Sequence, residues 1–223
     1  MPLALVLDFL RRLADNNNTA WMQAHRADYL LARDTFATLV TEVLRQATPQ
    51  VPELAGLTAA QAMFRLHKND RSQTDPEPYK RRLGAGLVPG GRHAERAGYF
   101  LALMPSGHSW LRAGRFAPTP AELAAIRQEI HYDSAGFHER LTDAALLCHF
   151  PNGLDTSVAQ LSRPPRGYRA DDPDLPSLKL KSYGVVHLFP DADVLASDFI
   201  RRVVAGMVAA RPWVQWLNQA LDE

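Results

Sequence analysis

The sequence predicts an α+β fold, a single domain in which a central antiparallel sheet is flanked by N-terminal and C-terminal helices. Apolar residues recur with helical spacing near both ends of the chain, as at Val6 and Phe9 and at Val203 and Met207. In the middle third, residues 63–67 alternate in character, and they are followed by short segments bounded by glycine, proline and serine. No repeat or linker divides the sequence, so we expect one domain over residues 1–223.

The N-terminal part predicts two helices separated by a polar loop. The first carries the stripe that begins at Val6, and residues 16–19 read Asn-Asn-Asn-Thr, which offers side-chain acceptors for a helix N-cap. From Trp21 onward a buried stripe predicts one long helix. This helix should end before Pro49, because a proline disfavours the helical conformation of the residue that precedes it.

The middle of the chain predicts strands, and the C-terminal part returns mainly to helices. Strands are expected at residues 63–67, 83–88, 98–104, 110–116 and 183–189, with turns at 89–91 and 105–107. Thr119, Pro120 and Glu122 form a capping-box pattern at the start of a helix. A further helix is expected over 134–146, irregular chain over 151–176, and a last helix from Ser197 that bends at Pro212.

Composition predicts an ordinary globular protein of the cytoplasm. The hydrophobic fraction is 46%, the charged fraction is 22%, and the net charge of +1 gives no overall attraction to nucleic acid or membrane. Cys148 is the single cysteine, so no internal disulfide forms, and its apolar surroundings predict a buried thiol. We expect no leader peptide and no membrane span.

Positive charge collects in one part of the chain. Residues 65–115 contain ten lysines and arginines but only four acidic residues. Arg65, Lys68 and Arg71 are three residues apart, and guanidinium groups suit carboxylate or phosphate ligands. This spacing predicts an anion site, in which Asp70 and Tyr79 could handle protons. Alternatively, the neighbouring acidic residues pair with these bases and only order a loop.

The same segment resembles a known family. Residues 65–80 read R-L-H-K-N-D-R-S-Q-T-D-P-E-P-Y-K, similar to the R-x-x-R-D-x-R-F-x-x-[DN]-K-x-P-Y-K motif of the DUF2461 family of bacterial proteins. The Asn-Asn pair at 17–18 with Trp21 and Tyr29, and the basic motifs at 163–168 and 178–183, also resemble that family. The resemblance implies membership over nearly the whole chain. The family has no established activity, so no mechanism is implied.

The departures from the family motif bear on chemistry. Lys68 stands where the family prefers Arg, Asn69 where it prefers Asp, Ser72 where it prefers Phe, and Pro76 where it prefers Lys. An amide cannot accept a proton as a carboxylate does. These replacements therefore favour a binding or structural role over catalysis.

Three functions remain open from the sequence. The first is a binding module for an anion, either a phosphorylated metabolite or a nucleic-acid backbone. Its expected ligand-binding residues are Arg65, Lys68, Arg71, Tyr79, Lys80, Arg82, Arg166, Lys179 and Lys181. The second is an enzyme for a phosphorylated or carboxylated substrate, with Asp70 or Tyr79 as catalytic candidates. The third is a structural motif, with the working surface elsewhere. The eight histidines lack metal-site spacing, so no metal is expected and no cofactor is indicated.

Overall fold

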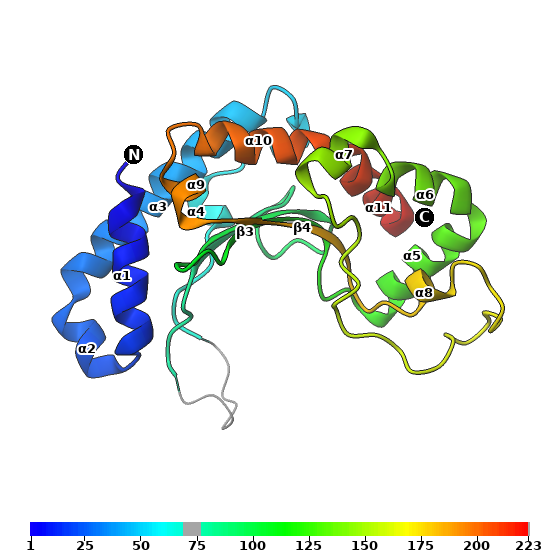
Figure 1. Ribbon diagram of the computed structural model, residues 1–223, viewed down its shortest axis with the longest axis horizontal. Coiled ribbons are helices and arrows are strands. Elements are labelled where there is room, and N and C mark those ends of the chain that lie inside the picture. Colours follow the sequence, from blue (N-terminus) through cyan, green and yellow to red (C-terminus); the bar gives the residue numbers. More distant parts are fainter. Residues whose placement is uncertain (69–76, 223) are drawn as a thin grey trace. The chain divides into compact units, whose positions relative to one another are not determined.

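The computed structural model describes residues 1–68 and 77–222, and it confirms the α+β fold class. Within these residues, four strands form one antiparallel sheet with the order β1-β2-β3-β4, and helices occupy both ends of the chain (Figure 1). The strands are β1 (Leu83–Leu87), β2 (Gly98–Leu103), β3 (Ser109–Arg115) and β4 (Tyr183–Phe189). All four lie within one residue of the strands expected at 83–88, 98–104, 110–116 and 183–189.

The helices account for most of the remaining chain. Before the sheet come α1 (Leu3–Asp15), α2 (Thr19–Ala24), α3 (Arg26–Ala47), the 3-10 helix η1 (Pro52–Leu54) and α4 (Ala59–Ala62). After β3 come α5 (Pro120–Tyr132), α6 (Ser134–Leu141), α7 (Ala144–His149) and α8 (Leu175–Leu178). After β4 come α9 (Asp191–Leu195), α10 (Phe199–Ala209) and α11 (Arg211–Asp222).

The chain divides into two compact units. Unit 1 is Met1–Ala94, Phe100–Leu111 and Leu188–Val204, and unit 2 is Glu95–Tyr99, Arg112–His187 and Ala205–Glu223. Strands β2, β3 and β4 and helix α10 contribute residues to both. The expectation of one domain over residues 1–223 stays a prediction beside this division.

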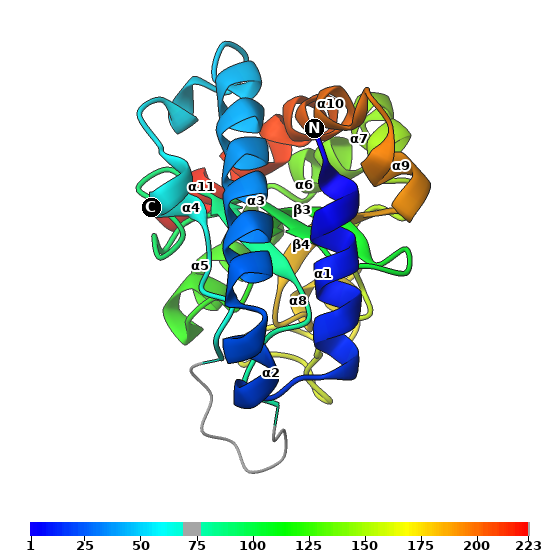
Figure 2. The same cartoon turned by 90° about the vertical axis from the view of Figure 1, so that its left-hand side faces the viewer.

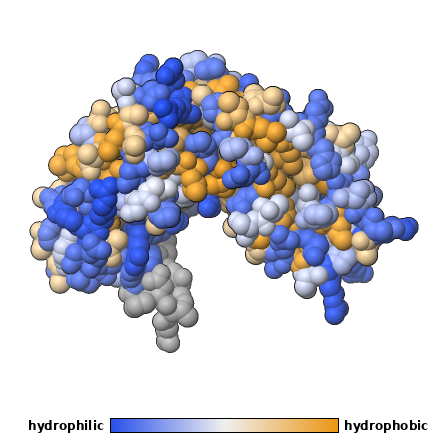
Figure 3. Space-filling model, in the orientation of Figure 1, coloured by the Kyte–Doolittle hydropathy of each residue, from blue (hydrophilic) through white to orange (hydrophobic). Residues whose placement is uncertain are grey.

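The core of unit 1 forms where α1 packs against α3. Figure 2 shows the two helices side by side. Leu10 and Leu13 of α1 and Phe36, Leu39 and Val40 of α3 are fully buried. The opposite faces stay polar, and Figure 3 shows hydrophilic residues over the C-terminal end of α1 and over α2. Burial of one apolar stripe per helix accounts for the helical spacing in the sequence.

The long helix predicted from Trp21 is interrupted at His25. Asn18 begins α2 as predicted, because its Oδ1 accepts a hydrogen bond of 2.9 Å from the Trp21 backbone N–H. His25 then leaves the helical conformation, with φ −109° and ψ 26°, and its Nδ1 lies 2.9 Å from the Trp21 carbonyl oxygen. This side-chain bond to the last turn of α2 accompanies the break, after which α3 starts at Arg26.

Two further predictions about elements are wrong. Residues 63–67 form isolated antiparallel bridges, Met63 with Ala85 and His67 with Tyr79, in place of a continuous strand. The helix predicted over 134–146 divides into α6 and α7, because the Asp143 side chain caps a new helix by accepting from the Leu146 backbone N–H at 3.0 Å. Cys148 on α7 is exposed, contrary to the predicted burial.

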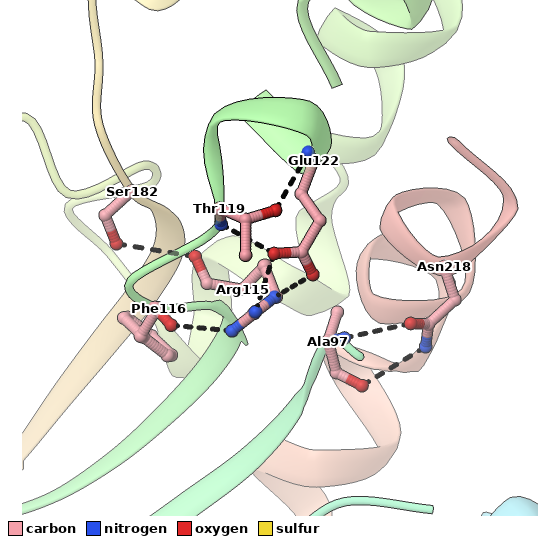
Figure 4. Close-up of polar contacts among 7 residues, drawn as sticks. All are labelled: Ala97, Arg115, Phe116, Thr119, Glu122, Ser182 and Asn218. Carbon is pink, nitrogen blue, oxygen red and sulfur yellow. Dashed lines mark hydrogen bonds and ion pairs between the residues drawn. The ribbon is translucent and has the colours of Figure 1, made fainter. Parts of the chain in front are cut away.

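The capping box at the start of α5 is confirmed in unit 2. The Thr119 hydroxyl accepts from the Glu122 backbone N–H at 3.3 Å, and the Glu122 carboxylate accepts from the Thr119 N–H at 2.6 Å (Figure 4). The same carboxylate accepts two bonds, of 2.7 and 2.8 Å, from Arg115 at the end of β3. Glu122 therefore caps its helix and fastens that helix to the strand before it.

The C-terminus is anchored in unit 2 by aromatic residues and one asparagine. Trp213 and Trp216 of α11 are buried and stacked, with ring centroids 5.5 Å apart. Asn218 donates to the Ala97 carbonyl at 3.2 Å and accepts from its N–H at 2.9 Å (Figure 4). The predicted bend lies at Ala210, just before Arg211 and Pro212.

The irregular connections agree with expectation. The segment between α7 and α8 is irregular apart from single bridges such as Leu154 with Val185 (Figure 1). The turn between β2 and β3 places Ser106 and Gly107 at φ 65° and 77°. No helix in the described part of the chain is both long and apolar enough to cross a membrane.

The Glu122 contacts predict an acid-sensitive contribution to stability. Burial raises the pKa of Glu122, but hydrogen bonds from Arg115 and Thr119 outweigh burial, and the net pKa lies below the usual value of 4.5. A lowered folded-state pKa adds stability above the unfolded-state pKa, and this contribution is lost as the pH falls through the folded-state value. Glu122→Gln should therefore lower the free energy of unfolding by about 1–3 kcal/mol at pH 7.

Urea unfolding at pH 7 and pH 3 measures this effect. The difference between the native protein and Glu122→Gln should shrink at pH 3, because the native carboxyl is then increasingly protonated. Glu139→Gln is the matched control, since Glu139 is exposed on α6 and changes charge equally. An equal loss in both variants, or a loss independent of pH, would contradict the assignment.

Candidate functional site

The basic motif is held by two short chain segments of unit 1 that lie antiparallel. The Lys68 N–H donates to the Pro78 carbonyl at 2.9 Å, and the Lys80 N–H donates to the Leu66 carbonyl at 2.9 Å. These bonds flank the bridge between His67 and Tyr79, whose rings meet edge to face. The buried Leu66 fixes this pairing to the core. We call residues 66–68 and 78–80 the paired strap.

Asn17 joins the strap to the N-terminal helices. Its amide donates to the Tyr79 carbonyl at 2.9 Å and accepts from the Tyr79 N–H at 3.1 Å. The same amide nitrogen lies 3.2 Å from Glu77 Oε2. Only an amide side chain offers a donor and an acceptor side by side for such an exchange. The sequence placed Asn17 in a capping loop and gave no signal for this contact, because Tyr79 is far away along the chain.

Two of the basic residues near the strap share one carboxylate. Lys68 Nζ lies 3.8 Å from Glu77 Oε2, and Arg81 pairs with the same carboxylate through Nε at 3.0 Å and through Nη2. Glu77 and Lys68 are both largely buried, with side chains 25% and 19% exposed. The local surplus of positive charge counted in the sequence is therefore partly neutralised at this point.

The Lys80 side chain also makes contacts within the protein. Its Nζ donates to the Arg65 carbonyl at 2.9 Å and lies 5.9 Å from the centre of the Phe64 ring. Burial, and then the nearby Arg82, lower the pKa of Lys80 below its usual value. Arg82 itself is exposed. Lys80 thus supports the backbone of Arg65.

The backbone next to Arg65 is held on both sides, whereas its side chain has no partner among the described residues. The Phe64 N–H donates to the Gly84 carbonyl at 2.9 Å on one side, and the strap begins at Leu66 on the other. Among the described residues, the Arg65 guanidinium has no hydrogen bond or ion pair.

Arg65 lines a pocket of about 370 Å³ together with two other arginines. The pocket, which we call the Arg65 pocket, receives Tyr29 and Arg33 from α3, and Arg92 from the turn after β1. Its apolar walls are Ala37, Ala60, Met63, Phe64 and Leu83. Among the described residues that line it, none is acidic. All of these residues belong to unit 1.

The other two guanidiniums of the Arg65 pocket have partners. Arg92 Nη1 donates to the carbonyls of Ala60 and Gln61, at 2.9 Å each, so the side chain is held while the rest of the guanidinium keeps donors. Arg33 pairs with the adjacent Asp34 at 2.7 Å. Both groups of this pair are well exposed, so water weakens their attraction.

Gly86 makes room for the Phe64 ring, which is part of the apolar wall of the Arg65 pocket. A Cβ atom on Gly86 would lie 3.2 Å from both the Phe64 and the Phe100 rings, and one on Gly84 would lie 3.8 Å from Phe64. Glycine therefore lets the Phe64 ring lie against β1. Both glycines lie inside β1, in the strand that was expected at residues 83–88.

The remaining predicted site residues lie elsewhere. Arg166, Lys179 and Lys181 belong to unit 2, where Lys179 and Lys181 flank the bridge between Gln160 and Leu180. Asp70 and Arg71 lie outside the described residues. Tyr79 contributes its backbone to the Asn17 contact. In the described part of the chain, no group of three histidine, cysteine, aspartate or glutamate side chains could hold a metal ion.

The chain belongs to the family described as conserved hypothetical protein (DUF2461), which it matches over residues 5–216. The match includes the Asn17 contact, the paired strap and every residue that lines the Arg65 pocket. No curated protein and no solved structure matches the chain. The family assignment thus confirms the resemblance seen in residues 65–80.

The contact between Asn17 and Tyr79 predicts a stability effect. Asn17→Asp removes the donor to the Tyr79 carbonyl and places a second carboxylate beside Glu77. We expect the free energy of unfolding to fall by about 1–3 kcal/mol, the cost of an unmade buried hydrogen bond. Chemical denaturation at neutral pH measures it.

Asn16→Asp is the matched control for this prediction. Asn16 is exposed, and its amide donates only to the Arg12 carbonyl at 2.9 Å, at the end of α1. The charge change is the same, so we expect a loss of no more than roughly 0.5 kcal/mol, as at other surface positions. Equal losses in the two variants would contradict the role given to Asn17.

Proposed function

We propose that this chain is a binding module for a small anionic ligand, which it holds in the Arg65 pocket. The observation that carries the proposal is the Arg65 guanidinium, which lines a pocket beside Arg33 and Arg92 and has no partner among the described residues. Guanidinium groups bind carboxylate and phosphate through paired N–H donors. A fixed backbone below Arg65 reduces the entropy that binding costs.

The structural contacts of the motif support a division of labour within it. Lys68, Tyr79 and Lys80 are engaged with Glu77, Asn17 and the Arg65 carbonyl. These contacts favour a positioning role for them, while Arg65 remains for the ligand. A role of Tyr79 in proton transfer stays a prediction, as does that of Asp70, which lies outside the described residues. A cytoplasmic location remains part of the proposal and rests on the single cysteine.

Binding of simple anions tests the proposal. The full chain is titrated with a panel of inorganic phosphate, glycerol 3-phosphate, acetate and hexanoate, and the melting temperature is followed. A ligand that binds only the folded state stabilises it by about 2.7 kcal/mol at a hundred times its Kd. We expect at least one of these anions to raise the melting temperature saturably. Arg65→Ala should weaken that binding roughly tenfold or more, the cost of a charge-assisted hydrogen bond.

Arg26→Ala is the matched control for Arg65→Ala. Arg26 is exposed at the start of α3, it has no side-chain partner in the described part of the chain, and it does not line the Arg65 pocket. Both variants remove one positive charge from unit 1. If Arg26→Ala weakened binding as much as Arg65→Ala, the effect would be one of overall charge. If no anion in the panel bound, the proposal would fail.

A further inference from the structure

We infer that the ligand of the Arg65 pocket is an amphiphilic acid, with one anionic head group on an unsubstituted apolar body. An alkyl or aryl carboxylate has this chemistry. The inference rests on the proposed function, because it names the class of anion that the same pocket takes. It differs from the phosphorylated metabolite and the nucleic-acid backbone that the sequence suggested.

The walls of the pocket carry the first part of the argument. Ala37, Ala60, Met63, Phe64 and Leu83 offer no strong hydrogen-bonding group in their side chains. Apart from the arginines, Tyr29 alone among the described lining residues adds a polar side chain. A sugar or polyol body would leave its hydroxyl groups facing these walls without partners, and such burial is costly. An apolar body incurs no such cost and gains from leaving water.

The apolar wall is formed before any ligand arrives. The Phe64 ring lies against Gly86, where an added Cβ would lie only 3.2 Å from it, and the Phe64 backbone N–H donates to the Gly84 carbonyl. Leu83, next along β1, is buried. Because these groups are held by the sheet, an apolar ligand can contact them without first ordering them.

The charges and the volume set the size of the ligand. Arg33 already pairs with Asp34, so Arg65 and Arg92 supply the positive charge that no carboxylate of the described residues balances. Two guanidiniums suit one anionic head, whereas a polyphosphate or a nucleic-acid strand presents several charges. The volume of about 370 Å³ lies near the lower end of the roughly 300–1,000 Å³ of small-molecule sites. The ligand is therefore compact.

A chain-length series tests the inference. Isothermal titration calorimetry of the full chain with acetate, butanoate, hexanoate and octanoate keeps the head group constant and lengthens the body. We expect the affinity to rise roughly fourfold for each added methylene group until the pocket is filled, since each buried CH₂ contributes about 0.8 kcal/mol. Hexanoate should bind at least tenfold more tightly than 1-hexanol, which lacks the charge, and more tightly than glycerol 3-phosphate.

Variants separate the head group from the body. Arg65→Ala should lower the affinity for every acid in the series by the same factor, roughly tenfold. The gain in affinity per methylene group should stay unchanged. Arg26→Ala should change neither. An affinity independent of chain length would overturn the inference, as would tighter, Arg65-dependent binding of glycerol 3-phosphate. In both cases the proposed anion binding would stand. If no anion bound, both the proposed function and this inference would fail.

Discussion

The antiparallel pairing of residues 66–68 with 78–80 is the constraint on which the candidate site depends. Asn17 closes this pairing from the N-terminal helices by exchanging two hydrogen bonds with the Tyr79 backbone. Asn218 makes the same exchange with Ala97 in unit 2. In each case one amide side chain satisfies the N–H and the carbonyl of a single residue outside a regular strand. Backbone that would otherwise need a neighbouring strand is thus held in place.

This constraint separates the basic residues by task. Basic side chains that pair with a carboxylate of the protein stabilise the fold, as Lys68 and Arg81 do through Glu77. An unpaired guanidinium on the surface is not by itself a sign of binding, because water solvates it well. The significance of Arg65 comes from its surroundings, since it shares a pocket with Arg92 and with the apolar wall of Phe64. There an anion could displace water from the arginines and from the wall at once.

Local patterns in the sequence predicted the fold class, the four strands and the caps at Asn18 and Thr119. These features depend on residues within a few positions of one another. The breaks at His25 and Asp143 were missed because the helical apolar spacing continues through them, and a side-chain bond decides between one helix and two. The alternation of residues 63–67 looks like a strand, but their partners, Ala85 and Tyr79, belong to different parts of the chain.

The charge surplus of residues 65–115 shows why the site was harder to predict than the fold. A count along the chain cannot include partners that folding brings from elsewhere. Arg96 pairs with Asp222 and Arg115 with Glu122, both outside the counted segment. Conversely, Arg33 lies before the segment and lines the Arg65 pocket. The pocket forms only where α3, β1 and the turn that carries Arg92 come together in the fold.

The departures from the family motif take on a physical meaning in this arrangement. The first departure is Lys68, whose amine lies 3.8 Å from the Glu77 carboxylate. A lysine can make this contact as a point charge, without the paired donors of an arginine. Arg65, by contrast, matches the first arginine of the motif and keeps the planar donors that a carboxylate requires. A reaction dependent on the aspartate that Asn69 replaces would suffer from the change, whereas binding at Arg65 would not. The chain thus retains the motif residue that lines the Arg65 pocket.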